Sequence, residues 1–476
     1  MKIELQTQST HNTRLILIYA GWSADERIAR HIDLPGWDVA VVHDYSDFTL
    51  DTSILNRYYT IYLFAWSLGV YASALTLPAD RITAAYAING TLHPVDETRG
   101  ISPDIYYGTA DHLSERNLLK FRMRMMRDRR QWEEVKEMFE PERSAEKDGS
   151  KGEEEVQIEE RIENLRQQLY NIGEASKEGR PLSSLPWVRA YISEDDKIFP
   201  AASQQRAWGE DPDVERVELY EGHYVDIEQI IKMVIPDREK VSEKFSKASI
   251  SYDTHAIAQY SAAIKLATQI GEMRPKPGGE ILEIGCGTGL FTKEYAEMLR
   301  PAHATFVDIT PTGPFGIAPT EEYYIEDAEE WIEKRSERWD AILSASCIQW
   351  FADLPRFLHQ CSLHLKEGGI LGVSSFLPGN MEELDQLRPS PLRYASTSQL
   401  EGWLQADYEE IKIVEDEIIV EFESVREMLM HLKHTGVGGS APTGTLSIGK
   451  MKGMNRLTYR PVYITARKKK VIKNAL

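Results

Sequence analysis

The sequence predicts an α/β protein with two domains in tandem, each built on a mostly parallel sheet. A buried-type apolar strand followed by a small-residue turn occurs twice, at residues 15–22 (LILIYAGW) and 280–289 (EILEIGCGTG). After each of them, further apolar segments alternate with helical patterns, which is typical of parallel sheets with helical crossovers. The length of 476 residues also suits two or three domains of roughly 100–200 residues each.

The domain boundary is expected in the polar segment 235–247 (IPDREKVSEKFSK), which follows an amphipathic segment. We therefore assign residues 1–238 to the first domain and 239–476 to the second. Residues 112–178 are expected to form a helical insertion in the first domain, because strand-like residues 187–193 (WVRAYIS) continue its pattern afterwards. The charged stretch 141–160 within this insertion is expected to be a solvated loop or a frayed helix start.

Composition narrows the class of protein. A net charge of −20 argues against general nucleic-acid binding, which needs basic surface. No apolar run reaches the ~18 residues that span a bilayer, and no secretory signal is visible at the N-terminus. Three cysteines are too few for a disulfide framework, and no CxxC pair indicates a metal site. We expect a cytoplasmic enzyme without a metal and without nucleic-acid or membrane partners.

The second glycine-rich turn points to a cofactor site. An apolar strand ends in Glu283 and leads to Gly285, Gly287 and Gly289, where glycine lets the backbone turn sharply and approach a ligand closely. The dinucleotide fingerprint G-x-G-x-x-G fails, because Leu290 occupies its third glycine position. The spacing E-x-G-x-G-x-G resembles motif I of the class I, Rossmann-like methyltransferases, which use S-adenosylmethionine as methyl donor.

The next predicted strand, ATFVDI, ends in Asp308, 19 residues beyond Gly289. An acidic side chain at this strand end can accept hydrogen bonds from both ribose hydroxyls of a nucleoside cofactor. Asp308 alone could equally be an ordinary helix N-cap, but the glycine loop in front of it favours the ribose role. The resemblance to motif I methyltransferases also places Asp327 and Ala328 where the adenine is bound.

Segments spread over residues 244–468 carry a more specific resemblance. KFSKASISYDTHAIAQ, LEIGCGTGLFT, SASCIQWFADLP, SSFLPGNMEEL and LMHLKHTGV resemble the malonyl-[acyl-carrier protein] O-methyltransferases, the BioC type of biotin synthesis. The resemblance implies methylation of the free carboxylate of malonyl-acyl carrier protein, with an N-terminal helix closing over the cofactor. The residues that it implies for positioning substrate or cofactor are Tyr252, His255, Gln259, Gln349 and Trp350. Packed core aromatics remain the alternative for Tyr252 and Trp350.

A nucleophile is indicated in the first domain. The segment IYLFAWSLGVYAS places Ser67 between an apolar strand and an apolar helix, in the pattern A-x-S-x-G. This is a variant of the nucleophile elbow G-x-S-x-G, with Ala65 in place of the first glycine. Alanine is the smallest side chain available for that strained turn. An ordinary helix N-cap is the alternative for a serine with these neighbours.

Two later segments complete a triad. ISEDDKIFP places Asp196 at the position of the acid, and YEGHYV places His223 after a glycine. The order Ser, Asp, His matches the α/β-hydrolases, so we expect an α/β-hydrolase fold with a helical lid insertion. His223 would take the proton of Ser67 and Asp196 would orient the imidazole. The backbone N–H groups of Trp22 and Leu68 would form the oxyanion hole.

The first half also resembles a specific family over residues 15–235. LILIYAGWSADE, HDYSDF, FAWSLGVYAS and AINGTLHPVDETRGI are similar to the pimeloyl-[acyl-carrier protein] methyl ester esterases of the BioG type. The resemblance implies hydrolysis of pimeloyl-acyl carrier protein methyl ester to the free acid and methanol. One half would then add a methyl ester that the other removes after chain elongation.

The predicted insertion contains a basic run, ERNLLKFRMRMMRDRRQW. A docking surface for acidic acyl carrier protein is expected there, since such charges steer encounter, although a solvated helix face is an equal alternative. The residues expected to dock the carrier are Arg122, Arg124, Arg127, Arg129 and Arg130. An alternative function also stays open: a methyltransferase of another small acid or a quinone precursor, fused to a catalytically dead, carrier-binding hydrolase-like module.

Overall fold

The computed structural model describes residues 1–9, 12–139, 151–385, 392, 394–435 and 455–470. The chain divides into two compact units, Met1–Ile231 and Lys232–Leu476. The predicted boundary at residues 238 and 239 coincides with the first residues of helix α8. Residues 141–150 of the predicted charged stretch lie outside the described residues. Within the described segments, we find no helix with both the length and the apolar character needed to cross a membrane.

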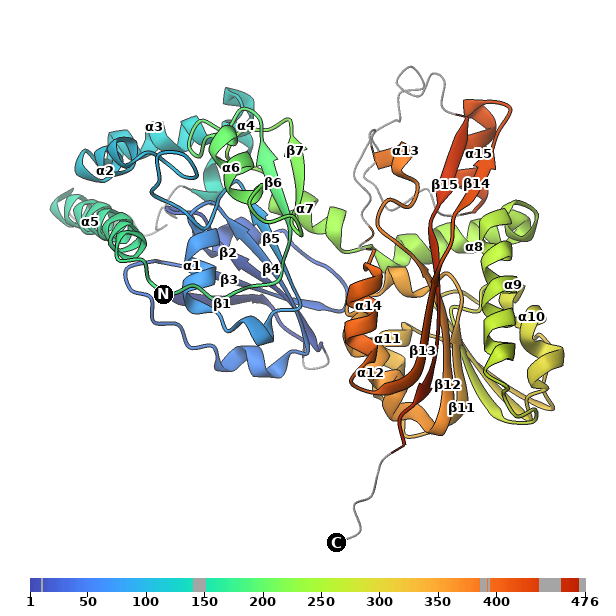
Figure 1. The fold of residues 1–476 in the computed structure, drawn as a ribbon. Coiled ribbons are helices and arrows are strands. Elements are labelled where there is room, and N and C mark those ends of the chain that lie inside the picture. Colours follow the sequence, from blue (N-terminus) through green and yellow to red (C-terminus); the bar gives the residue numbers. More distant parts are fainter. Residues whose placement is uncertain (10–11, 140–150, 386–391, 393, 436–454, 471–476) are drawn as a thin grey trace, which may run out of the picture. The chain divides into compact units, whose positions relative to one another are not determined.

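Unit 1 is built on a seven-stranded sheet in the order β1-β3-β2-β4-β5-β6-β7 (Figure 1). Neighbouring strands pair in parallel, except that β1 runs antiparallel to β3. The residues of β2 and β4 are buried throughout, as expected for parallel strands covered on both faces. The strands are β1 (Lys2–Thr7), β2 (Arg14–Tyr19), β3 (Trp37–His43), β4 (Thr60–Trp66), β5 (Ala84–Ile88), β6 (Trp187–Ser193) and β7 (Glu215–Leu219).

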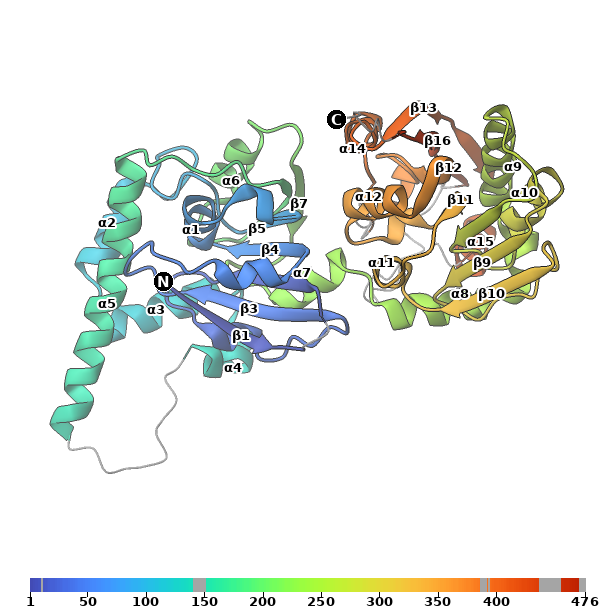
Figure 2. The ribbon, with the colours of Figure 1, turned by 90° about the horizontal axis from the view of Figure 1, so that it is seen from below.

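The segment predicted as a helical insertion contains α3, α4 and α5. Helices α2, α3 and α5 lie together at one side of the sheet in both ribbon views (Figures 1 and 2). Each of these three helices contributes side chains to a small cavity beside Ser67, so the insertion covers the end of β4. The helices of this half are α1 (Gly69–Thr76), α2 (Pro103–Asp111), α3 (Glu115–Met125), α4 (Arg129–Val135), α5 (Lys151–Lys177), α6 (Ala201–Trp208) and α7 (Ile227–Val234).

Unit 2 contains a second seven-stranded sheet, in the order β10-β9-β8-β11-β12-β16-β13. The first five strands are parallel, whereas β16 runs antiparallel to both β12 and β13. The order of the parallel strands confirms the predicted Rossmann-like arrangement of the C-terminal half. The strands are β8 (Glu280–Ile284), β9 (His303–Asp308), β10 (Thr320–Ile325), β11 (Trp339–Ser344), β12 (Leu365–Phe376), β13 (Tyr408–Glu415), β14 (Ile418–Glu421), β15 (Arg456–Tyr459) and β16 (Pro461–Lys468).

Helices cover both faces of this sheet. Helices α9 and α10 pack on one face and α11, α12 and α14 on the other, each with its own apolar core (Figure 1). A third apolar cluster joins α13 and α15 to the small β14–β15 sheet and the first turn of α9. The helices are α8 (Arg238–His255), α9 (Ile257–Glu272), α10 (Leu290–Leu299), α11 (Ala328–Glu333), α12 (Leu354–His364), α13 (Glu382–Asp385), α14 (Thr397–Leu404) and α15 (Val425–His434).

Candidate active sites

Ser67 lies in a sharp turn between β4 and α1. Its φ of 58° is in the left-handed region, which costs energy for any residue with a side chain. A Cβ at Gly69 would lie 2.6 Å from the carbonyl oxygen of Tyr19, so the close approach of α1 to β2 requires glycine. Ala65 is completely buried within β4, in the packed interior where a small side chain is easily accommodated. The local geometry is that of a strand–turn–helix elbow with the serine at its tip.

Ser67, His223 and Asp196 form one chain of hydrogen bonds. The Nε2 atom of His223 lies 2.8 Å from Ser67 Oγ. On the other side of the ring, Nδ1 lies 2.8 Å and 3.0 Å from the two carboxylate oxygens of Asp196. All three side chains are buried. The structure thus brings the three residues predicted from separate segments into hydrogen-bond contact, with His223 between Ser67 and Asp196.

The carboxylate of Asp196 is held from several directions. It accepts the backbone N–H groups of Ile198 at 2.9 Å and Phe199 at 2.8 Å, and the Nε2 amide of Gln204 at 3.1 Å. These donors fix the direction in which the carboxylate faces His223. The neighbouring Asp195 instead pairs with a lysine on the surface, so the choice of the second aspartate agrees with the geometry.

A small, mostly apolar cavity of about 30 Å³ adjoins Ser67. Trp22 and Leu68 both line it. Their backbone N–H groups donate to no acceptor among the described residues, so both donors are available to an oxyanion. The other residues around the cavity are Gly21, Trp66, Ile101, Ile105, Tyr106, Thr109, Phe121, Arg124, Met125, Leu169, Ile198 and His223.

The prediction that Arg122 docks the carrier protein is wrong. Arg122 is only 5% exposed, and its guanidinium donates to the carbonyl oxygens of Ser23, at 2.8 Å, and Phe139. It lies on the buried face of α3 together with Leu118 and Met125. A charged residue on that face must find partners inside the protein, and here it ties the insertion to the loop after β2.

The other four predicted arginines lie at the surface. Arg124 also lines the cavity beside Ser67. Arg127 is 3.3 Å from Glu221, two residues before His223, and Arg130 forms an ion pair along its own helix. The Arg127 and Arg130 side chains are 51% and 88% exposed, so their charges remain accessible from solvent.

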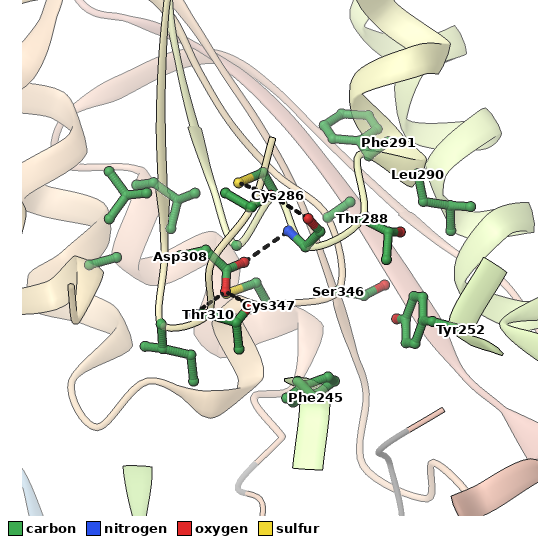
Figure 3. Close-up of a pocket in the computed structure, with 18 of the residues that line it drawn as sticks. Phe245, Tyr252, Cys286, Thr288, Leu290, Phe291, Asp308, Thr310, Ser346 and Cys347 are labelled. Carbon is green, nitrogen blue, oxygen red and sulfur yellow. Dashed lines mark hydrogen bonds between the residues drawn. The ribbon is translucent and has the colours of Figure 1, made fainter. Parts of the chain in front are cut away.

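A larger cavity of about 520 Å³ lies in unit 2, where β8, β9 and β11 end (Figure 3). This is the edge at which open α/β sheets bind ligands, and the volume is ordinary for a small-molecule site. Phe245 and Tyr252 of α8 face the cavity opposite Asp308 and Cys347. Of the residues predicted for this half, those that line the cavity are Gly285, Gly287, Asp308, Ala328, Tyr252, Gln259 and Trp350.

The three predicted glycines each occupy the left-handed region, with φ of 69°, 50° and 80°. A Cβ at Gly285 would lie 2.3 Å from Cys347 Sγ, and one at Gly289 would lie 2.5 Å from the Phe315 ring. A Cβ at Gly287 would meet nothing within 4 Å, so its backbone is open to the cavity. Gly285 and Gly289 therefore allow close packing, while Gly287 offers a bare backbone to a ligand.

The structure does not bring Glu283 into the cavity, contrary to our expectation that it binds the cofactor. Its buried carboxyl accepts hydrogen bonds from Thr292 Oγ1 at 2.7 Å and Tyr295 Oη at 2.5 Å. Burial raises the pKa of Glu283 to about 7. Glu283 therefore holds the first turns of α10 beneath the glycine loop.

Four other predicted residues also lie outside the cavity lining. Gly289 stands at the N-terminus of α10, and Asp327 caps α11 by accepting a backbone N–H at 3.0 Å. His255 stacks on His434, with 4.5 Å between ring centroids. The Nε2 atom of Gln349 donates to the carbonyl oxygen of Ser346 at 2.7 Å. These residues belong to the elements around the cavity and do not form its surface.

Sequence reasoning missed residues that the structure places in the cavity, notably Ser346 and Cys347, which lie just beyond the end of β11 at Ser344. Ser346 Oγ and Gln259 Oε1 are buried, and neither has a hydrogen-bond partner in the described segments. Buried polar atoms are rarely left unpaired in proteins, so these two indicate a ligand. The rule that ligands bind at the ends of central strands would have found Ser346.

Comparisons with known proteins also divide the chain into an N-terminal and a C-terminal domain. Residues 2–228 match the family described as pimeloyl-ACP methyl esterase BioG, and residues 252–410 match a methyltransferase domain family. A malonyl-[acyl-carrier protein] O-methyltransferase of Bacteroides fragilis is 29% identical over 95% of this chain and 93% of its own. The corresponding protein of Acinetobacter baylyi is 31% identical over 49% of this chain and 97% of its own.

Among solved structures, BioG from Haemophilus influenzae is 29% identical and covers 48% of this chain and 95% of its own, with a TM-score of 0.41. The B. fragilis protein spans both halves of this chain, whereas the A. baylyi protein matches about half of it. The chain therefore belongs to the malonyl-[acyl-carrier protein] O-methyltransferase family and carries a BioG domain ahead of its methyltransferase domain.

Proposed function

We propose that the chain is a bifunctional enzyme of biotin synthesis. The C-terminal half methylates the free carboxylate of malonyl-acyl carrier protein, and the N-terminal half hydrolyses pimeloyl-acyl carrier protein methyl ester. The observation that carries this proposal is the presence of two separate, complete constellations in one chain. One is the hydrogen-bonded chain of Ser67, His223 and Asp196, and the other is the glycine-loop cavity beside Asp308.

The cavity of unit 2 fits S-adenosylmethionine, which supplies a methyl group on a sulfonium centre. Gly287 would approach the amino-acid part of this cofactor through its bare backbone, and Asp308 would accept the ribose hydroxyls. Ala328 would lie against the adenine. The unpartnered oxygens of Gln259 and Ser346 supply further acceptor and donor capacity inside the same cavity.

The substrate carboxylate needs no general base, because it is nucleophilic once ionised. The protein's task is to hold it in line with the methyl group and to exclude water. Tyr252 suits this role: burial raises its pKa far above the usual range, so the phenol keeps its proton and can donate a hydrogen bond. Its helix, α8, also contributes Val241 and Phe245 to the lining of the cavity.

For the N-terminal half we propose an α/β-hydrolase fold in which α3, α4 and α5 form the lid. His223 Nε2 takes the proton of Ser67 as Oγ attacks the ester carbonyl. The N–H groups of Trp22 and Leu68 donate to the developing oxyanion. The same proton then passes to the leaving methoxide, and methanol departs. Water hydrolyses the acyl-enzyme with His223 again as base, which frees the carboxylic acid.

The carrier protein would dock on the exposed face of α3. Positions 116, 119, 120, 123 and 124 follow one another along this face at helical spacing, and all are exposed. They combine three cations with two apolar side chains, which suits a partner with acidic and apolar surface. Arg124 ends the row at the cavity of Ser67, so a docked carrier would hold its acyl arm close to the nucleophile.

The test uses the full-length protein and both carrier-bound substrates. Labelled S-adenosylmethionine should transfer its methyl group to malonyl-acyl carrier protein in preference to free malonate or phenolic acids. A fluorophosphonate should label Ser67, and pimeloyl-acyl carrier protein methyl ester should be hydrolysed. Methyl transfer to a phenolic acid instead would refute the first assignment. An unlabelled Ser67 without ester hydrolysis would identify the first half as a catalytically inactive binding module.

A further inference from the structure

Asn89 stands beside the triad at the end of β5, in the distinctive segment AINGTLHPVD. Its side chain is completely buried. Its φ of 47° lies in the left-handed region, which asparagine adopts more readily than most residues. A buried polar side chain in a strained backbone position is retained only where its hydrogen bonds are specific.

The amide of Asn89 joins the two loops that carry the acid and the base. Its Nδ2 atom lies 2.9 Å from the carbonyl oxygen of His223 and 3.2 Å from that of Gly222. The same nitrogen lies 2.9 Å from Ser193 Oγ, while Oδ1 accepts the backbone N–H of Ser193 at 2.8 Å. Ser193 is the last residue of β6, three residues before Asp196.

The nucleophile is fixed to the same segment. The backbone N–H of Ser67 donates to the carbonyl oxygen of Ile88 at 2.8 Å. A Cβ at Gly90 would lie 2.2 Å from the carbonyl oxygen of Ser67, so the chain on either side of Asn89 packs directly against the nucleophile turn. The residues around Asn89 therefore contact all three loops that form the triad.

The carbonyl oxygen of His223 accepts a second hydrogen bond, from Trp66 Nε1 at 3.0 Å. The next residue, Tyr224, donates its backbone N–H to the carbonyl oxygen of Met125 at 2.9 Å. The main chain of His223 is therefore held from β4, from β5 and from the insertion. Of the three residues that make these hydrogen bonds, only Asn89 also forms hydrogen bonds with the strand that leads to Asp196.

We propose that Asn89 is a positioning residue of the esterase. It fixes the main chain of His223, and with it the 2.8 Å approach of Nε2 to Ser67 Oγ. This inference rests on the proposed ester hydrolysis. Asn89 does not line the cavity and is not expected to contact substrate. Because a misplacement of about 1 Å can cost ~100-fold in rate, loss of this amide should slow the chemical step and spare substrate binding.

Two substitutions at Asn89 distinguish the effect of losing the side-chain amide from the effect of the strained backbone conformation. Asn89→Gly removes the side chain and suits the positive φ, so any loss of rate comes from the missing hydrogen bonds. Asn89→Asp keeps the shape and the acceptor for Ser193 N–H but removes the donors toward Gly222 and His223. Ser193→Ala is the matched control, since it removes one acceptor and leaves both amide–carbonyl contacts in place.

The measurement is the hydrolysis of p-nitrophenyl butyrate by full-length protein, with active sites counted by fluorophosphonate titration of Ser67. Both Asn89 variants should lose about 10- to 100-fold in kcat per titrated site, with KM within about twofold, and Ser193→Ala should stay close to wild type. A merely structural role would lower the number of titrated sites and leave kcat per site within about twofold of wild type, which would overturn the inference. Wild-type protein that is neither labelled nor active would refute the esterase proposal instead.

Discussion

The carboxylate of Asp308 accepts the backbone N–H of Gly287 at 2.8 Å, which ties the end of β9 to the glycine loop after β8 (Figure 3). Its other oxygen accepts the backbone N–H and the hydroxyl of Thr310 at 2.8 Å and 2.7 Å. A carboxylate has about four acceptor sites, and these three donors leave room for a further donor such as a ribose hydroxyl. Asp308 is therefore both an anchor of the loop and a candidate ligand for the cofactor.

Asp308→Ala should weaken the binding of S-adenosylmethionine by about 10- to 100-fold. Each hydrogen bond to a charged group contributes about 1.5–3 kcal/mol, and the substitution also releases the glycine loop. Calorimetric titration measures the Kd directly. Asp340→Ala is the control, because Asp340 accepts a backbone N–H at 2.8 Å but does not line the cavity. Equal affinities in the two variants would remove Asp308 from the cofactor site.

Glu283→Gln should change how the stability of unit 2 depends on pH. The folded protein holds the Glu283 proton up to a pKa of about 7, whereas the unfolded chain releases it near the ordinary value of 4.5. Between these pH values the unfolded state binds fewer protons, so this group lowers stability as pH rises.

Glutamine can accept the same two hydrogen bonds without ionising. The melting temperature of unit 2 should therefore be similar in both proteins below about pH 4.5 and higher in the variant at pH 7.5. The difference corresponds to a free energy of unfolding of about 3 kcal/mol. Parallel melting curves of the two proteins across this pH range would contradict the protonated, buried state of Glu283.

Reversing a charge on α3 should weaken docking of the carrier protein and leave the chemical step of ester hydrolysis unchanged. Lys120→Glu should lower kcat/KM about fivefold on the carrier-bound ester at low salt and leave p-nitrophenyl ester hydrolysis unchanged. High salt should remove the difference, because exposed charges are screened. Lys177→Glu on α5 is the matched control.

Arg122→Glu should instead destabilise unit 1, because it would place an acid among carbonyl oxygens. If Lys120→Glu and Lys177→Glu lower kcat/KM on the carrier-bound ester equally, the docking surface lies elsewhere.

The esterase should select its substrate by chain length. Hydrolysis of malonyl methyl ester would undo the other half's reaction, whereas the pimeloyl chain has about four more methylenes to bury. At ~0.8 kcal/mol each, these would favour the longer ester by about 100-fold in kcat/KM. Apolar side chains such as Ile105 and Leu169 beside Ser67 are available for this contact. Comparable turnover of the two carrier-bound esters would contradict the prediction.

Local patterns were sufficient to predict much of the fold and part of both sites. The strand at residues 187–193 is found at its predicted bounds, because its aromatic and β-branched residues (Trp187, Val188, Tyr191 and Ile192) are a local signal for a strand. The order of Ser67, Asp196 and His223 was visible because each residue follows its own strand-like segment. The glycines of the cofactor loop were visible because their spacing reports backbone conformation.

Burial and pairing across segments were not visible. In the sequence, Arg122 is one of many cations in a basic run. Only the packing of the folded insertion shows that its side chain is buried. From the sequence, Glu283 is predicted to bind the cofactor. Nothing in the sequence shows that its hydrogen-bond partners are Thr292 and Tyr295 in the next helix. The role of Asn89 depends on three loops that meet only in the folded chain. Such residues can be identified only from tertiary contacts.

The central claim is that one chain carries two independent reactions, and single-site variants of the full-length protein test it most directly. Wild type, Ser67→Ala and Asp308→Ala should each be assayed for methyl transfer to malonyl-acyl carrier protein and for hydrolysis of pimeloyl-acyl carrier protein methyl ester. Ser67→Ala should lose at least ~1,000-fold in hydrolysis and keep full methyl transfer. Asp308→Ala should keep full hydrolysis and lose about 10- to 100-fold in methyl transfer at a cofactor concentration below the wild-type Kd. Hydrolysis that survives in Ser67→Ala, or methyl transfer that is lost with it, would contradict the account.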